Sequence, residues 1–239
     1  MTWIIFAAIV VLLLGGLVAY SRISNPSIDV SAIDANAVVS ASDQDGNIGD
    51  HVRGSADAKV VIVEYGDFQC PYCGNIHPAT QTITSLYGDS IAFVFRNFPL
   101  ATLHPNARAA SAAAEAAGLQ GKYWEMHDTL YEGQSAWEGA GATERTAVFN
   151  GYAEQLDLDL AKFQEDLSNA SVNKKISFDQ ALGKKLNVTA TPTMYLNGTK
   201  LTEEITAQLQ SGDTSGIKAL INAELKKAGV AVPAAAIEE

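Results

Sequence analysis

The sequence predicts an α/β fold in which two groups of strands are separated by a long helical stretch. Three observations predict it: a strand–helix–strand pattern over 59–95, helical patterns without strand signals over 106–186, and a strand hairpin followed by a helix over 193–228. Strands that follow one another through a helix indicate a parallel, buried sheet. The predicted order is therefore β-α-β, helices, β-β-α, preceded by an N-terminal transmembrane helix.

Composition excludes several classes of protein. The 239 residues carry 16 Lys and Arg against 27 Asp and Glu, a net charge of −11 with no basic cluster. Nucleic acid is therefore excluded as a partner, because binding phosphate requires concentrated positive charge. The chain has two cysteines, Cys70 and Cys73, which excludes a disulfide-dense scaffold and a zinc site of four sulfurs. We expect no cofactor.

The first strand–helix–strand unit begins at Lys59–Tyr65, a continuous apolar and β-branched run that is typical of a strand buried on both faces. Pro71 suits the first position of a helix, and Gly88 is placed to end it. Ile91–Phe95 is a second buried run. Together they predict a βαβ unit with a right-handed crossover.

The middle of the chain is predicted to be helical, and the strands return after it. Segments with helical propensity or periodicity are Asn106–Gly118, Lys122–Glu132, Thr143–Leu156, Leu160–Leu167 and Val172–Leu186. Thr193–Leu196 and Thr199–Leu201 are strand signals on either side of Asn197-Gly198, the pair that favours a type I′ hairpin turn. Gly216–Ala228 is the predicted last helix, and 231–239 is a tail.

The N-terminus carries an uncharged run of 18 residues, Trp3–Tyr20, which is long enough to span a bilayer as a helix. Aromatic residues at its ends favour a membrane anchor. The alternative is a cleaved signal peptide, for which Ala19-Tyr20-Ser21 is a mediocre cleavage site. The following segment, 21–50, is rich in Ser, Asp, Asn and Ala and is predicted to be a flexible linker.

The chemistry is concentrated in Cys70-Pro71-Tyr72-Cys73, which follows a buried strand and starts a helix. This context indicates redox chemistry. A helix N-terminus stabilises a thiolate, so we expect Cys70 to be the nucleophile and Cys73 the resolving thiol. A structural disulfide and half of a metal site are the alternatives, but a four-residue loop is a poor staple and a metal needs more ligands. His77 is interpreted as an exposed helix histidine, so no metal site is predicted.

Four motifs carry a resemblance to a known family. They are Glu64–Gly74, Phe95–Leu100 with His104-Pro105, Gln120–Asp128 and Thr191–Thr193. They resemble the DsbA family of thiol–disulfide oxidoreductases, above all its membrane-tethered or lipid-tethered bacterial members. The resemblance covers about 51–228. It implies a thioredoxin-like domain over 51–230, interrupted by a helical insertion over about 101–187.

The resemblance also implies roles for particular residues. Cys70 and Cys73 match the redox pair, and Pro71-Tyr72 matches the dipeptide that tunes its potential. Thr191 and Pro192 match the cis-proline loop, which binds the backbone of the substrate. Strong oxidants of the family have histidine at the position of Tyr72 and often an apolar residue at that of Thr191, which leaves a reductase or isomerase role open.

Two further residues are candidates for supporting roles. Glu64 matches the buried acid that helps proton transfer to the inner thiol, since burial raises the pKa of a carboxyl. An exposed glutamate at a strand end is the alternative. Phe68, beside the redox motif, is a candidate for an apolar docking surface.

The sequence therefore predicts an extracytoplasmic enzyme that oxidises cysteine pairs through Cys70 and Cys73, because disulfides persist outside the cytoplasm. The alternatives are a disulfide reductase or isomerase, and a non-enzymatic binding or chaperone module with a structural disulfide. We expect secreted or envelope proteins with cysteines as substrates and a bacterial membrane as the site of anchoring. By analogy, a membrane oxidase of the DsbB or VKOR type would reoxidise it. Cleavage would instead release a secreted or periplasmic protein.

Overall fold

The computed structural model describes residues 3, 6–7, 10–13, 15–16 and 28–237. Its centre is a five-stranded sheet in the order β1-β3-β2-β4-β5. The strands β2 and β3 are parallel, and the other neighbouring pairs are antiparallel. The strand bounds are β1 Val52–Gly54, β2 Val61–Gly66, β3 Ala92–Asn97, β4 Thr193–Leu196 and β5 Thr199–Lys200.

The predicted βαβ unit is confirmed. Between β2 and β3 lies α2 (Pro71–Tyr87), with Pro71 at its first position and Gly88 as its C-cap. Ile76 and Ile83 on α2 are fully or almost fully buried. The helix thus packs its apolar residues into the core while its N-terminus, which carries the cysteines, lies at the end of the central strand β2.

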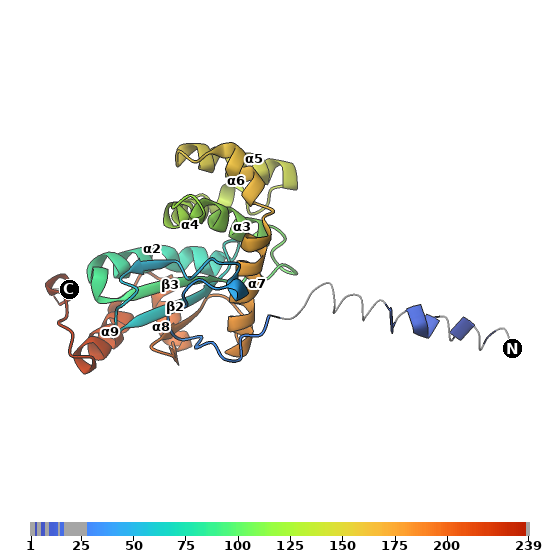
Figure 1. Ribbon diagram of the computed structural model, residues 1–239. Helices are drawn as coiled ribbons and strands as arrows, with labels where there is room; N and C mark the ends of the chain where they lie inside the picture. The colour runs from blue at the N-terminus through green and yellow to red at the C-terminus, as the bar shows by residue number, and fades with distance from the viewer. Residues whose placement is uncertain (1–2, 4–5, 8–9, 14, 17–27, 238–239) are drawn as a thin grey trace.

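The predicted helical insertion lies between β3 and β4. It contains α3 (Ala107–Gly118), α4 (Tyr123–Glu132), α5 (Ala142–Gln155), α6 (Leu160–Asp166) and α7 (Ala170–Lys185). In Figure 1, α3 to α6 form helical layers above the sheet, and α7 runs down from them to the sheet. A thioredoxin-like α/β fold with inserted helices is therefore confirmed.

The C-terminal part adds the hairpin of β4 and β5 and the helices α8 (Glu203–Gln210) and α9 (Ser215–Lys227). Asn197 and Gly198 have positive φ angles of 45° and 78°, which fits the predicted type I′ turn. The sequence analysis did not predict α8. Its start carries a usable signal, because the Thr202 side chain caps the Ile205 N–H and the first turn is acidic.

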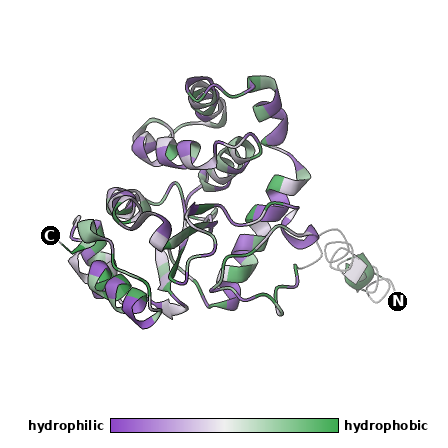
Figure 2. Ribbon diagram, turned by 60° about the vertical axis from the view of Figure 1, so that its left-hand side comes forward, coloured by the Kyte–Doolittle hydropathy of each residue, from purple (hydrophilic) through white to green (hydrophobic). Residues whose placement is uncertain are grey.

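Alternation along β2 assigns its side chains to two different cores. Ile62 belongs to the core shared with α2, α4 and α9, whereas Val63 and Tyr65 belong to a second core formed with α7 and the N-terminal segment. Successive side chains of a strand point to opposite faces. Glu64 therefore faces α2, as Ile62 does. Figure 2 shows hydrophobic and hydrophilic residues distributed around the covering helices, as expected of elements that contact both core and water.

The described part of the predicted flexible linker, 28–50, is packed against the domain, which corrects the prediction for these residues. Lys185 donates from Nζ to the backbone oxygens of Val30 and Ser31 at 3.1 and 2.9 Å, and Arg96 donates to that of Ala37 at 2.8 Å. Val30 and Ala35 are buried in the second core. Side chains of the domain therefore bind the backbone of this segment, and its apolar side chains help to fill the second core.

The remaining predictions for the N-terminus are not tested by this structure. Residues 21–27 and part of the predicted anchor 3–20 lie outside the described residues. Among the described residues, no helix combines the length and the apolar character that crossing a membrane requires.

Candidate active site

Cys70 lies where β2 has ended and α2 begins. It is the N-cap of α2, its backbone N–H donates to the Asp67 carbonyl at 3.0 Å, and its own carbonyl accepts the Gly74 N–H at 3.1 Å. Pro71 follows at the first helical position, where its missing N–H costs nothing. The Cys70 sulfur is thereby held at the positive end of a helix of 17 residues.

The two cysteines differ in their ionisation. A hydrogen bond with the Cys73 thiol, together with hydrogen bonds from the Thr191 side chain and the backbone N–H groups of Cys73 and Tyr72, lowers the pKa of Cys70 to about 6 against the opposing effect of burial. Burial, followed by the hydrogen bond and charge of Cys70, raises the pKa of Cys73. Cys70 is 4% exposed and Cys73 is fully buried. Near neutral pH this pair holds one thiolate and one thiol.

The loop before β4 contacts Cys70 from the other side. The Thr191–Pro192 peptide bond is cis, and in its thiol form Cys70 donates from Sγ to the Thr191 carbonyl at 3.4 Å. The Thr191 hydroxyl is buried and has no other hydrogen-bond partner within the described chain. It is therefore available to donate to the thiolate form of Cys70.

Glu64 is buried beneath the two cysteines, on the face of β2 that is covered by α2. It is 3% exposed, and its backbone neighbours across the sheet are Phe95 on β3 and Met194 on β4. Burial, with a smaller effect of the Cys70 charge, raises the pKa of Glu64 to about 8. At neutral pH its carboxyl is mostly protonated and has a proton to give.

Phe68 does not form a docking surface, because it is fully buried. Its ring packs against Phe95 and Tyr131, with ring centres 4.9 and 5.0 Å apart. The sequence prediction was wrong because a residue beside a redox motif can point into the core. Tyr72, between the cysteines, is 57% exposed and is the apolar side chain that the motif presents to solvent.

Two polar residues that hold the redox loop were missed in the sequence. Buried Asp67 accepts the Gln69 and Leu100 N–H groups, each at 2.8 Å. From the insertion, Gln134 donates its side-chain amide to the carbonyls of Phe68 and Cys70 at 2.7 and 3.1 Å. An Asp two residues before the bonded N–H is a turn signal that the sequence offers, but nothing in the sequence places Gln134 here.

His77 is buried rather than exposed, which corrects the interpretation of it as a surface histidine. It is 4% exposed and lies close to His127 and Asp128 of α4. Among the described residues, these three form the group of side chains that fits a metal ion. The redox cysteines do not belong to that group.

Comparison with known proteins identifies relatives of this chain. Residues 46–211 match the family model described as Thioredoxin. The Na(+)/H(+) antiporter NhaA 1 of Salinispora arenicola is 44% identical over 149 residues, which are 62% of this chain and 22% of the antiporter. The chain thus spans about a fifth of the length of the curated relatives that it matches.

Solved structures share the fold over most of its length. BdbD from Bacillus subtilis has a TM-score of 0.63 and 26% identity, and the match covers 80% of this chain and 99% of BdbD. A thioredoxin-like oxidoreductase from Silicibacter pomeroyi has a TM-score of 0.55 and 26% identity, and the match covers 71% of this chain and 92% of that protein. α-DsbA1 from Wolbachia pipientis has a TM-score of 0.61 and 20% identity, and the match covers 75% of this chain and 94% of that protein, which is a likeness of fold.

Proposed function

Because the chain belongs to the thioredoxin family and is a DsbA-like thiol–disulfide oxidoreductase, we propose that it oxidises cysteine pairs of protein substrates outside the cytoplasm. The observation that carries this proposal is the opposite shift of the two thiols, with the pKa of Cys70 lowered to about 6 and that of Cys73 raised. A thiol that is stabilised as thiolate is a good leaving group and makes its disulfide a better oxidant.

The reaction runs by two thiol–disulfide exchanges. A substrate thiolate attacks Cys70 Sγ of the oxidised pair, the Cys70–Cys73 bond breaks, and Cys73 leaves with the electron pair. The second substrate thiol loses its proton and attacks the substrate sulfur of the mixed disulfide. Cys70 then departs as a thiolate. The substrate has lost two electrons and two protons, and the enzyme pair is reduced.

Surrounding groups support these steps. Glu64, whose pKa is raised to about 8, gives a proton to Cys73 as it leaves and takes one back on reoxidation. The Thr191 hydroxyl stabilises the departing Cys70 thiolate. Exposed Tyr72 and the backbone around Pro192 are where an extended substrate chain docks.

The location and the partners are part of the same proposal. The apolar run Trp3–Tyr20 anchors the chain in a bacterial membrane with the catalytic domain outside, and its cleavage is the alternative. Secreted or envelope proteins with cysteines are the substrates. Since each turnover leaves the pair reduced, a membrane oxidase of the DsbB or VKOR type is proposed as the reoxidant. An extracytoplasmic site suits this direction because disulfides persist there.

The test is the reduction potential of the Cys70–Cys73 pair, measured by equilibration with glutathione buffers. An oxidase is expected to have a potential of about −180 mV or higher, whereas a value near the about −270 mV of thioredoxin would contradict the oxidising role. Cys73→Ala is expected to trap mixed disulfides through Cys70, and Cys70→Ala, as the matched control, to trap none. A Cys73→Ala protein that captures no partner in an oxidising envelope would favour a non-enzymatic module.

A further inference from the structure

A second cluster of reactive side chains lies between α2 and α4, apart from the two cysteines. His77 comes from α2, and His127 and Asp128 come from α4. One ligand atom from each residue lies within 4.8 Å of the other two. The histidines are 4% and 2% exposed, and the Asp128 side chain is 24% exposed, so the cluster is buried but reaches the solvent on one side.

Three nitrogens of this cluster lack the hydrogen bonds that burial normally requires. Both ring nitrogens of His77 and Nε2 of His127 are buried without a partner within the described chain. A buried polar group without a hydrogen bond is costly, and native structures contain few of them. His77, with both ring nitrogens in this state, therefore indicates a ligand that the protein atoms do not supply.

His127 and Asp128 are already arranged as a pair of ligands. The His127 ring is enclosed by those of Phe95, Trp124 and Tyr131, with ring centres 4.7, 5.0 and 5.1 Å away. Its polar contact within this apolar surrounding is a hydrogen bond between Nδ1 and Asp128 Oδ1 at 2.9 Å. A cation that binds both atoms takes the place of the proton between them.

Charge at the cluster is compatible with a cation. His77 is 4% exposed, and burial favours the neutral form of its ring, which is the form that binds a metal ion. Arg53 donates to Asp128 Oδ2 at 2.7 Å and leaves Oδ1 to face the histidines. A hydrogen bond to the outer oxygen of a ligating carboxylate is a common means of orienting it. Glu132, one helical turn beyond Asp128, adds negative charge near His77.

We propose that His77, His127 and Asp128 bind one divalent transition-metal ion of the zinc type. Two imidazoles and a carboxylate are ligands that this class of ion prefers, and the solvent-facing side of Asp128 leaves a fourth position for water. Such an ion joins the helix that carries Cys70 and Cys73 to the helical insertion. It stabilises their packing without taking part in the exchange reaction, so this inference stands independently of the proposed oxidising role.

The test is a zinc titration of the oxidised, untagged full-length chain after removal of metals by a chelator. Oxidation is essential, because the reduced Cys70–Cys73 pair is itself a zinc ligand. We expect one equivalent of Zn²⁺ to bind and to raise the melting temperature by mass action. Co²⁺ is expected to give a visible spectrum without the charge-transfer band of a thiolate ligand. An oxidised chain that binds no Zn²⁺ would overturn the proposal.

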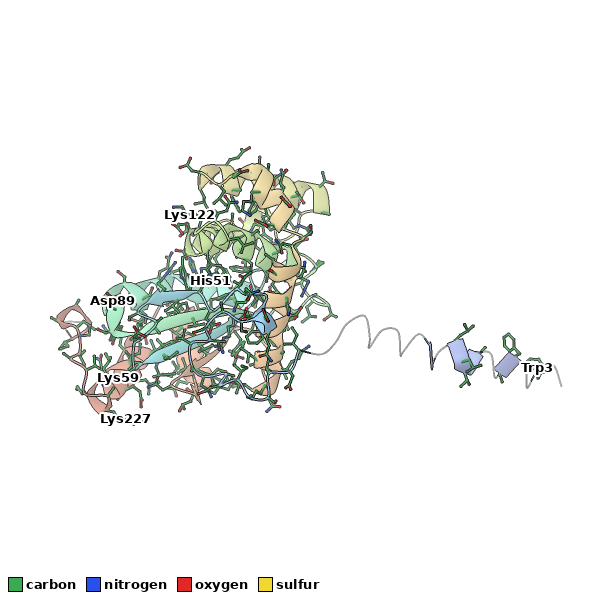
Figure 3. The ribbon with its side chains drawn as sticks, in the orientation of Figure 1. Trp3, His51, Lys59, Asp89, Lys122 and Lys227 are labelled. Carbon is green, nitrogen blue, oxygen red and sulfur yellow. The ribbon has the colours of Figure 1, made fainter. Side chains whose placement is uncertain are left out.

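Variants assign the ion to the three residues. His77→Gln and Asp128→Asn are each expected to weaken Zn²⁺ binding at least about tenfold, because loss of even an outer partner of a ligand weakens metal binding about 10- to 100-fold. Asp89→Asn is the matched control, because Asp89 is an exposed carboxylate in a short 3-10 helix, Gly88–Ser90, at the edge of the domain (Figure 3). Equal affinity of the His77→Gln chain and the unmodified chain would overturn the proposal.

A measurement on the unmodified chain avoids any dependence on how the variants fold. The chain has four histidines, His51, His77, His104 and His127. Nitrogen-15 NMR of their rings during the zinc titration is expected to shift His77 and His127. The other two are internal controls, and Figure 3 shows one of them, His51, between the sheet and the insertion. Shifts confined to the two controls would contradict the proposal.

Discussion

The two faces of the central sheet bury ionisable groups in different ways. On the face covered by α7, Arg96 bonds to Asp50 at 2.6 Å, and Lys175 bonds to Asp50 and Asp179 at 3.2 and 2.7 Å. On the face covered by α2, Glu64 and Cys73 are buried beside Cys70 with no cation among the causes of their pKa shifts.

This difference indicates that the ionisable groups of the two faces have different roles. Although burial opposes ionisation, Lys175 and Arg96 hold the pKa of Asp50 below its usual range, so Asp50 stays charged at ordinary pH values. Asp179 shares Lys175 with Asp50, and burial raises its pKa to about 6. On the other face burial raises the pKa of Glu64 to about 8, within the working range of a proton donor. Asp50, with two cations beside it, keeps a fixed charge, whereas Glu64, with none among the causes of its pKa shift, holds a proton that it can exchange.

Removal of an ion-pair partner on the face covered by α7 is expected to have the largest effect on stability. Arg96→Met removes the main partner of Asp50 and the donor to the Ala37 carbonyl, which leaves a buried charge partly uncompensated. We expect a loss of about 3–5 kcal/mol in urea unfolding, with the Cys70 pKa unchanged. Lys122→Met, which removes the exposed pair with Glu125, is the control and is expected to change stability by less than about 1 kcal/mol. Equal losses would contradict the comparison.

Buried Glu64, on the face covered by α2, is expected to make the stability of the protein depend on pH. The folded-state pKa of Glu64, about 8, lies above its ordinary value of 4.5, so the folded state holds a proton that the unfolded state releases. Its contribution to stability is complete below pH 4.5 and is lost as the pH rises through 8. In the oxidised protein, Glu64→Gln is expected to flatten the fall in unfolding free energy over this interval.

Urea unfolding at several pH values measures this effect. Oxidation removes the cysteine ionisations, and burial, the main cause of the Glu64 shift, remains. Glu154→Gln, at an exposed position on α5, is expected to keep the slope of the unmodified chain. A Glu64→Gln protein with an unchanged slope would show that Glu64 is ionised in the fold.

A smaller effect is expected from the hydroxyl of the loop before β4. Thr191→Val removes a donor to the Cys70 thiolate and is expected to raise its pKa by about one unit, because a hydrogen bond to a charged group contributes about 1.5 kcal/mol. Thr193→Val is the matched control, since its hydroxyl donates to the Ala190 carbonyl at 2.8 Å. The rate of alkylation of Cys70 against pH measures both. An equal rise in the Cys70 pKa of the Thr193→Val control would show that the Thr191 hydroxyl does not stabilise the Cys70 thiolate.

The fold was predictable where the local pattern and the tertiary environment agree. The apolar run of β2, the proline that starts α2 and the Asn197-Gly198 turn each specify one structure, and the structure has it. β1 was missed because three residues, Val52–Gly54, carry no periodicity and become a strand through pairing with β3. The segment 28–50 was misread because its order depends on Lys185 and Arg96, which are far away in sequence.

The candidate site was predictable only in part, for the same physical reason. A helix N-terminus after a buried strand is a local feature, so the chemistry of Cys70 follows from the sequence. The side on which Phe68 points, the contact of Gln134 with the redox loop and the approach of His77 to His127 depend on how α4 and its following turn dock. No local signal determines that docking.

The central claim is that the fold holds Cys70 as a thiolate while Cys73 keeps its proton. Thiolate absorbance of the reduced protein, followed against pH with Cys70→Ser as the reference, measures it directly. The account predicts one transition near pH 6 that disappears in the variant, with Cys73 protonated well above neutral pH. Two thiols that ionise together near pH 9, the ordinary value, or a Cys73 that ionises first, would contradict it.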